Sequence, residues 1–166
     1  MAIEIGESFV GEGVEAAHLN TVLGLREGPV GAAWATALAT PTTGHAPYLV
    51  VLQPGLPVKP PTLFVNKAAI AGDEHARMTW GAAQAGVAGG VADALADAVI
   101  CAEESDALVL IAAVWVNPLA RDAEAVYRNN RRATREALAA GRAHAPAAAE
   151  VLAAREHPWN PFFRSA

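Results

Sequence analysis

The sequence predicts a single domain of mixed strands and helices, of the α/β or α+β class. Its 166 residues are enough for one domain with a hydrophobic core, and two domains would be cramped. The clearest strand runs from Ala107 to Val116, which is apolar throughout. The clearest helix runs from Asp122 to Gly141, with a capping residue near its start and a glycine at its end. No internal repeat or low-complexity linker divides the chain, so we expect one domain over residues 1–166.

The first half should contain four strands and one helix. The expected elements are a strand from Ile3 to Val10, a strand from Ala16 to Leu25, a helix from Val30 to Ala39, a strand from Tyr48 to Leu52 and a strand from Leu63 to Ala69. The Tyr48 strand is apolar throughout, which favours a central place in the sheet. Three prolines between Leu56 and Pro61 remove backbone donors, so this segment should be an extended connector outside any regular ladder.

The second half should be mainly helical around the Ala107 strand. Gly72-Asp73 offers a helix N-cap, and Gly81 should interrupt the helical segment that follows. The expected elements are a helix from His75 to Trp80, a helix from Ala82 to Ile100, the Ala107 strand, the Asp122 helix, a short helix from Ala145 to Arg155 and an irregular aromatic tail from His157 to Phe163. We expect this tail to dock against its own domain or a neighbour.

Composition limits the possible partners and locations. The net charge is −5, without the basic stripe of a nucleic-acid binder. The N-terminus lacks the features of a signal peptide, and the longest apolar run is about half of a membrane span. We therefore expect a cytoplasmic protein that binds neither nucleic acid nor membrane. Only 17% of residues are charged and small residues are abundant, which favours a homo-oligomer.

Several common site types are missing from the sequence. It has no dinucleotide fingerprint, phosphate loop or nucleophile elbow, and no Cys/His spacing that fits zinc. The one basic cluster lies on the Asp122 helix, where a solvated face is the favoured interpretation and an anion site the alternative. Its members are Arg128, Arg131, Arg132 and Arg135. Taken singly, each of the five histidines is more often structural than catalytic. They are His18, His45, His75, His144 and His157.

Five runs together resemble the formaldehyde-activating enzyme family. They are Gly-Glu-Ser-Phe-Val-Gly-Glu-Gly at 6–13, Glu-Ala-Ala-His at 15–18, Pro-Gly-Leu-Pro-Val-Lys-Pro at 54–60, Thr-Leu-Phe-Val-Asn-Lys at 62–67 and Gly-Ala-Ala-Gln-Ala-Gly-Val-Ala at 81–88. Their order and spacing agree with the family from about residue 3 to about residue 140. The Asn-Lys pair and the run around Gln84 are the most specific features.

The resemblance implies a fold, an activity and an assembly. Family members resemble the second domain of ribosomal protein S5, so an α+β domain with helices packed on a sheet is expected. They condense formaldehyde with tetrahydromethanopterin, a lyase reaction of one-carbon metabolism and formaldehyde detoxification that yields methylene-tetrahydromethanopterin and water. They form homopentamers that bind the pterin between subunits. No metal or prosthetic group is implied, and the pterin is a co-substrate.

The resemblance also implies roles for individual residues. His18 matches the family's proton donor, a role that suits histidine because it titrates near neutrality. Leu49, Lys67 and Gln84 match positions that line the pterin site. Asn20 also falls in that substrate-binding set, although the family has aspartate there.

Two positions depart from the family pattern. Asn20 replaces an aspartate, and Ala69 replaces a threonine that stands two residues after the lysine. If both segments are strands, each departure shares a face with a retained residue. Losing a carboxylate near His18 should favour the neutral imidazole and weaken it as an acid. The departures leave two alternatives open: condensation of formaldehyde with another amine or pterin, or binding of formaldehyde or pterin without turnover.

Overall fold

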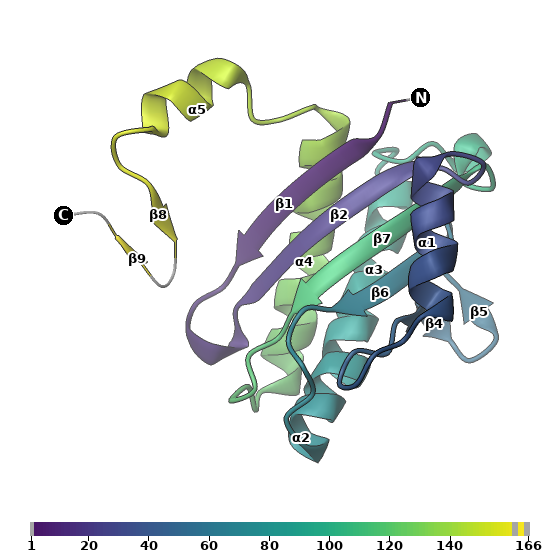
Figure 1. The fold of residues 1–166 in the computed structure, drawn as a ribbon, viewed down its shortest axis with the longest axis vertical. Coiled ribbons are helices and arrows are strands. Elements are labelled where there is room, and N and C mark those ends of the chain that lie inside the picture. Colours follow the sequence, from purple (N-terminus) through teal and green to yellow (C-terminus); the bar gives the residue numbers. More distant parts are fainter. Residues whose placement is uncertain (1, 161–162, 165–166) are drawn as a thin grey trace.

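The computed structural model describes residues 2–160, 163 and 164, and Figure 1 shows its fold. The main sheet consists of β1 (Glu4–Val10), β2 (Ala17–Leu25), β3 (Tyr48–Leu49), β6 (Thr62–Asn66) and β7 (Leu108–Trp115). The helices are α1 (Pro29–Ala39), α2 (Asp73–Ala76), α3 (Gln84–Ala96), α4 (Ala123–Arg142) and α5 (Ala148–Ala154). A π-helix, η2 (Arg77–Ala83), joins α2 to α3, and the short 3₁₀ turns are η1 (Gly13–Glu15) and η3 (Ala102–Glu104). Two small hairpins pair β4 (Val51–Gln53) with β5 (Leu56–Pro57) and β8 (Trp159–Asn160) with β9 (Phe163–Arg164).

The sheet is mixed, and its order is β1-β2-β7-β6-β3. β6 and β7 are parallel, whereas the other neighbouring pairs are antiparallel. This arrangement confirms the α+β prediction. The strand from Ala107 to Val116 is confirmed as β7, the middle strand. Its residues that face α3 and α4, such as Leu110 and Val114, are fully buried, whereas Ile111 and Ala113 on the other face are partly buried.

Helices lie on both faces of the sheet, but they cover them unequally. Figure 1 shows α3 and α4 behind the sheet and α1 in front of it. The hydrophobic core lies between the sheet and the two longer helices, with Phe64 and Leu110 of the sheet fully buried alongside Val87 of α3. By contrast, Val30 is the buried residue of α1. It packs at Gly24, near the end of β2, so α1 covers one end of the front face.

The segment from Tyr48 to Leu52 is not a central strand, and that prediction was wrong. It is broken at Val50 into β3, at the edge of the sheet, and β4, which pairs with β5 instead. The connector prediction for Leu56–Pro61 was wrong in part, because Leu56–Pro57 forms the short strand β5. A proline is tolerated there because this two-stranded ladder is an edge. An apolar run predicts burial or an interface, but it does not fix which strands lie beside it.

Two element boundaries also differ from the predictions. The strand expected to reach Ala69 ends at Asn66, whose side-chain amide donates 2.8 Å hydrogen bonds to the carbonyls of Gly44 and Ala68 and so fixes a turn. The helix expected to stop at Gly81 instead passes through it in η2. The segment then continues as α3, which ends at Ala96 rather than Ile100.

The described residues after α4, which are 143–160, 163 and 164, form a segment that we call the C-terminal arm. It leaves the end of α4 and extends beyond β1 (Figure 1). The helix expected from Ala145 to Arg155 is confirmed as the shorter α5. Part of the tail is a small hairpin of β8 and β9 rather than irregular chain. Phe162 lies outside the described residues.

Candidate functional site on the open face of the sheet

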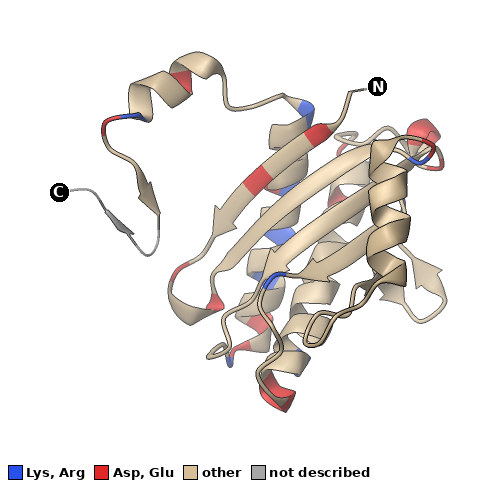
Figure 2. Ribbon diagram, viewed as in Figure 1, with Lys and Arg blue, Asp and Glu red and all other residues tan. Residues whose placement is uncertain are grey.

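Alternate residues of β1 and β2 face opposite sides of the sheet. Gly6 faces α4, because a side-chain carbon added there would lie 1.8 Å from the carbonyl oxygen of Ala137. The period-two alternation of a strand then places Glu7 and Phe9 of β1 on the other side, the face that carries α1. We call the part of this face that α1 leaves uncovered the open face. In Figure 2 the strands of the main sheet are mostly uncharged, apart from acidic residues on β1 and a basic residue where β6 ends.

His18 lies on the open face, near the start of β2. Strand pairing sets it between Phe9 of β1 and Trp115 of β7. The rings of Phe9 and His18 are 5.9 Å apart between centroids and inclined at 53°. The imidazole Nε2 lies 3.2 Å from Oε1 of Glu7, and the side chain of His18 is 37% exposed. A half-exposed imidazole beside a carboxylate is well placed to exchange a proton with a bound molecule.

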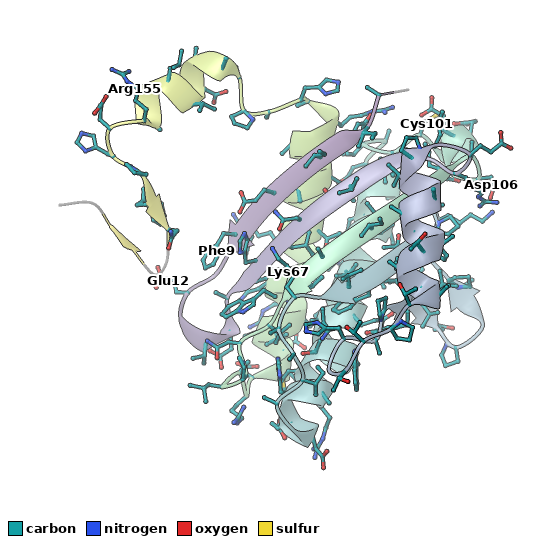
Figure 3. The ribbon with its side chains drawn as sticks, in the orientation of Figure 1. Phe9, Glu12, Lys67, Cys101, Asp106 and Arg155 are labelled. Carbon is teal, nitrogen blue, oxygen red and sulfur yellow. The ribbon has the colours of Figure 1, made fainter. Side chains whose placement is uncertain are left out.

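Asn20 and Lys67 meet on the same face, although they are 47 residues apart. The Lys67 ammonium donates a 2.6 Å hydrogen bond to Oδ1 of Asn20. The backbone amide of Lys67 donates to the carbonyl of Val114 on β7, which holds the lysine where β6 ends. Figure 3 shows Phe9 and Lys67 on the part of the sheet away from α1. The structure therefore brings three of the predicted residues, His18, Asn20 and Lys67, onto one surface.

Leu49 and Gln84 do not join this group within one chain. Leu49 lies on β3, three strand spacings from β2, or about 14 Å across the sheet. Gln84 is buried at the start of α3, and its side-chain oxygen accepts a 2.8 Å hydrogen bond from the backbone amide of Val51. In the single chain, Gln84 therefore holds β4 in place behind the sheet.

The two departures from the family pattern have different surroundings. Asn20 shares a strand face with His18, as expected. Ala69, however, follows the end of β6, so the expectation that it shares a strand face with Lys67 was wrong. It lies beside Gly44, where an added side-chain carbon would approach its Cβ to 3.1 Å. Asn20 brings no carboxylate to His18, but Glu7 from the neighbouring strand supplies one.

Glu7 and Phe9 lie at this site, although neither was predicted from the sequence as a site residue. Both belong to β1, and the alternation of that strand could have placed them on one face. Together with His18 they line a hollow of about 400 Å³, whose other wall comes from Trp159 and Asn160 of the C-terminal arm. The hollow is large enough for part of a small molecule.

The remaining histidines have structural surroundings or lie elsewhere. His75 is buried, and both of its ring nitrogens are engaged, one by the backbone amide of Ala71 and the other by the carbonyl of Val116. His45 bonds through Nδ1 to the carbonyl of Asn66. Each arginine of the α4 cluster contacts a carboxylate, which favours the solvated-face interpretation over an anion site. The partners are Glu124 for Arg128, Asp93 for Arg131, Glu136 for Arg132 and Asp97 for Arg135.

Among residues 2–160, 163 and 164, no three His, Cys, Asp or Glu side chains gather as metal ligands would. None of the helices described in that part of the chain is long and apolar enough to span a membrane.

The mixed sheet and its open face define the class: a small α+β protein with a candidate small-molecule site on one sheet surface. A sequence model described as formaldehyde-activating enzyme (Fae) matches residues 5–163. The chain belongs to the formaldehyde-activating enzyme family.

Curated relatives fall into two groups. A 5,6,7,8-tetrahydromethanopterin hydro-lyase of Methanosarcina barkeri is 40% identical over 158 residues, which are 95% of this chain and 89% of that protein. A bifunctional enzyme Fae/Hps of Archaeoglobus fulgidus is 37% identical over 162 residues, or 98% of this chain and 41% of that protein. Another, from Methanococcoides burtonii, is 44% identical over 81% of this chain and 34% of that protein. The chain therefore spans less than half the length of these bifunctional relatives.

Proposed function

We propose that this chain is a hydro-lyase that condenses formaldehyde with tetrahydromethanopterin to methylene-tetrahydromethanopterin and water. The observation that carries the proposal is the meeting of His18, Asn20 and Lys67 on the open face, in a chain of this family. The relative from Methanosarcina barkeri, a 5,6,7,8-tetrahydromethanopterin hydro-lyase, matches nearly the whole chain. The reaction belongs to one-carbon metabolism and formaldehyde detoxification, and we place it in the cytoplasm.

His18 is proposed as the general acid. One amine nitrogen of the pterin forms a bond to the formaldehyde carbon, which gives an N–CH₂–OH group. The His18 imidazolium then donates a proton to this hydroxyl, the C–O bond breaks, and water leaves. The second amine nitrogen bonds to the resulting N=CH₂⁺ carbon and returns its proton to the imidazole. Formaldehyde and two N–H groups thus become N–CH₂–N and water, and His18 ends as it began. Histidine suits both steps because it titrates near neutral pH.

Asn20 and Lys67 are proposed to bind the pterin beside His18. An ammonium has three donors, and the hydrogen bond to Asn20 uses one of them. The Asn20 amide can donate as well as accept, so the pair offers both kinds of partner to the polar edge of a heterocycle.

Leu49 and Gln84 are proposed to reach the substrate from a second copy of the chain, within a homopentamer whose sites lie between subunits. Leu49 is exposed at the β3 edge, and Leu52 and Leu56 of the adjoining β4–β5 hairpin are exposed as well. An apolar edge of this kind is typical of a surface that another chain covers. Residues that are separated by the width of the sheet in one chain can then share one site.

The central experiment measures methylene-pterin formation by the purified chain from formaldehyde and tetrahydromethanopterin, against the spontaneous reaction. We expect wild type to accelerate the reaction and His18→Ala to lower kcat by about 100-fold, which is the low end for loss of a general acid. His144→Asn is the matched control, because His144 is exposed just after the end of α4 at a positive φ of 52° that asparagine tolerates. Light scattering should give a pentamer mass for all three proteins. The proposal fails if wild type does not exceed the spontaneous rate.

A second candidate function is condensation of formaldehyde with a different amine or pterin. The neutral Asn20 opposite Lys67 favours it, because an aspartate there would neutralise the ammonium. Under this alternative, another amine raises the Tm of the protein more than tetrahydromethanopterin does. If instead the pterin binds and no rate effect is seen with any amine, the chain is a binding protein without turnover.

A further inference from the structure

The carboxylate of Glu7 contacts the imidazole of His18, the proposed general acid. Its Oε1 lies 3.2 Å from Nε2 of His18, and its side chain is 59% exposed on the open face. The two residues come from adjacent strands, where Glu7 pairs with Asn20 and Phe9 pairs with His18. Glu7 therefore approaches the imidazole diagonally, while Phe9 packs beside it from the paired position.

The strand that carries Glu7 is fixed on both sides of this residue. Arg142 of α4 donates a 2.6 Å hydrogen bond to Glu4, whose side chain is buried. Ser8 donates a 3.0 Å hydrogen bond to Glu136, also on α4. Together with the close approach of Gly6 to α4, these contacts hold the backbone of β1 in register. The carboxylate of Glu7 therefore extends from a rigid base, as a group that orients another side chain must.

The other charged or titratable groups near this pair are Lys67 and three residues of the C-terminal arm. Lys67 donates to Asn20 on the side of β2 away from Glu7. A second hollow, lined by Glu7, also receives Glu150, Arg155 and His157 from the C-terminal arm. Arg155 is paired with its neighbour Glu156 at 2.9 Å.

We propose that Glu7 is the positioning residue for His18. With Nε2–H donating to Glu7, the ring is oriented and Nδ1–H of the imidazolium becomes the proton that the leaving hydroxyl accepts. The carboxylate stabilises the imidazolium through charge but exchanges no proton itself, so the proton balance of the reaction is unchanged. This inference rests on the proposed function, and it assigns to a strand neighbour the charge that Asn20 does not supply.

The test compares Glu7→Gln, which removes the charge, with Glu7→Asp, which keeps it on a shorter side chain. Orienting partners of functional histidines are worth roughly 10–100-fold at metal sites. Because Glu7 is half exposed, we expect the low end: a fall in kcat of about tenfold in Glu7→Gln, with KM within about twofold. A residue that only stabilises the fold would not give this separation of kcat from KM. Glu7→Asp should retain more of kcat than Glu7→Gln.

Glu12→Gln is the matched control, because Glu12 is exposed in the turn after β1 and its side chain caps no helix. It should behave as wild type. The inference is overturned if Glu7→Gln keeps kcat within twofold of wild type, or if Glu7→Gln and Glu7→Asp lose kcat equally. The ¹⁵N chemical shifts of the His18 ring, measured by NMR at one fixed pH, separate the two proposals because they report the hydrogen bond of Nε2 directly. If wild type has no condensation activity, the proposed function fails, and the ring shifts alone decide the role of Glu7: an unchanged Nε2 shift in Glu7→Gln overturns it.

Discussion

The contact between Gly6 of β1 and Ala137 of α4 should make Gly6→Ala strongly destabilising. An added Cβ would lie 1.8 Å from the carbonyl oxygen of Ala137 and 2.6 Å from its carbonyl carbon. Real Cβ contacts essentially never fall below 3.0 Å, so the strand and the helix must separate by about 1.2 Å. The obstacle is helix backbone, which cannot rotate away as a flexible side chain can.

The loss in free energy of unfolding follows from the size of that separation. A gap of 0.5–1 Å already forfeits roughly a quarter to a half of the dispersion energy at a contact. Ala133, Ala137 and Leu138 of α4 are buried near this contact and would lose part of their packing against the sheet. Overpacking typically costs about 1–3 kcal/mol, and a backbone clash of this depth belongs at the upper end, near 3 kcal/mol. For a chain of this length, that is a fall in Tm of about 6–12 °C.

Thermal and urea unfolding at one fixed protein concentration measure the effect, because assembly makes Tm depend on concentration. Gly81→Ala is the control, since no atom lies within 4 Å of the added carbon. At this helical position, the substitution should raise the free energy of unfolding by no more than about 1 kcal/mol. The packing argument is refuted if Gly6→Ala costs less than about 1 kcal/mol, or if both variants lose stability equally.

Two further predictions concern the phenol of Tyr48 and the amide of Asn20. Burial raises the pKa of the Tyr48 phenol above its ordinary range, whereas in the unfolded chain it ionises near pH 10. The unfolded state therefore loses this proton first as pH rises, so stability is full below about pH 10 and declines above it. Tyr48→Phe should flatten that alkaline decline in urea unfolding between pH 9 and 11, and equal slopes would contradict the argument. Asn20→Asp gives Lys67 a charged partner and restores the family's residue. It should raise kcat/KM for tetrahydromethanopterin by roughly tenfold, because a carboxylate accepts a hydrogen bond from a neutral N–H group of the pterin more strongly than an amide oxygen does. Because the pair of Lys67 and residue 20 is exposed, the substitution should change the free energy of unfolding by less than about 1 kcal/mol. An unchanged kcat/KM would argue that the amide of Asn20 already binds the pterin as well as a carboxylate would.

Much of the secondary structure was predictable because its signals are local. The alternation of β2, the apolar run of β7 and the capped start of α4 each depend on residues within a few positions of one another. Asp122, for instance, accepts a 3.0 Å hydrogen bond from the backbone amide of Ala125, as an N-cap should. The errors fell where a distant contact decides the outcome, as at Asn66, whose amide bonds to Gly44 and helps to end β6.

The site was predictable only through the resemblance, and only in part. His18, Lys67 and Gln84 stand in recognisable motifs, but no local pattern places them relative to one another. The structure brings His18 and Lys67 to one face and leaves Gln84 behind the sheet, bonded to Val51. Glu7 escaped notice because a glutamate on a strand is most often solvated surface, and its partner lies on another strand.

The sequence by itself determined most of the strands and helices, and it identified the family through motifs that carry His18 and Lys67. Only the tertiary structure decided that β2 lies between β1 and β7, and that Lys67 therefore reaches Asn20 while Glu7 reaches His18. The physical reason is that periodicity fixes the face a side chain occupies, whereas sheet order fixes its neighbours. Sheet order depends on packing between segments far apart in the chain, which no short stretch of residues encodes.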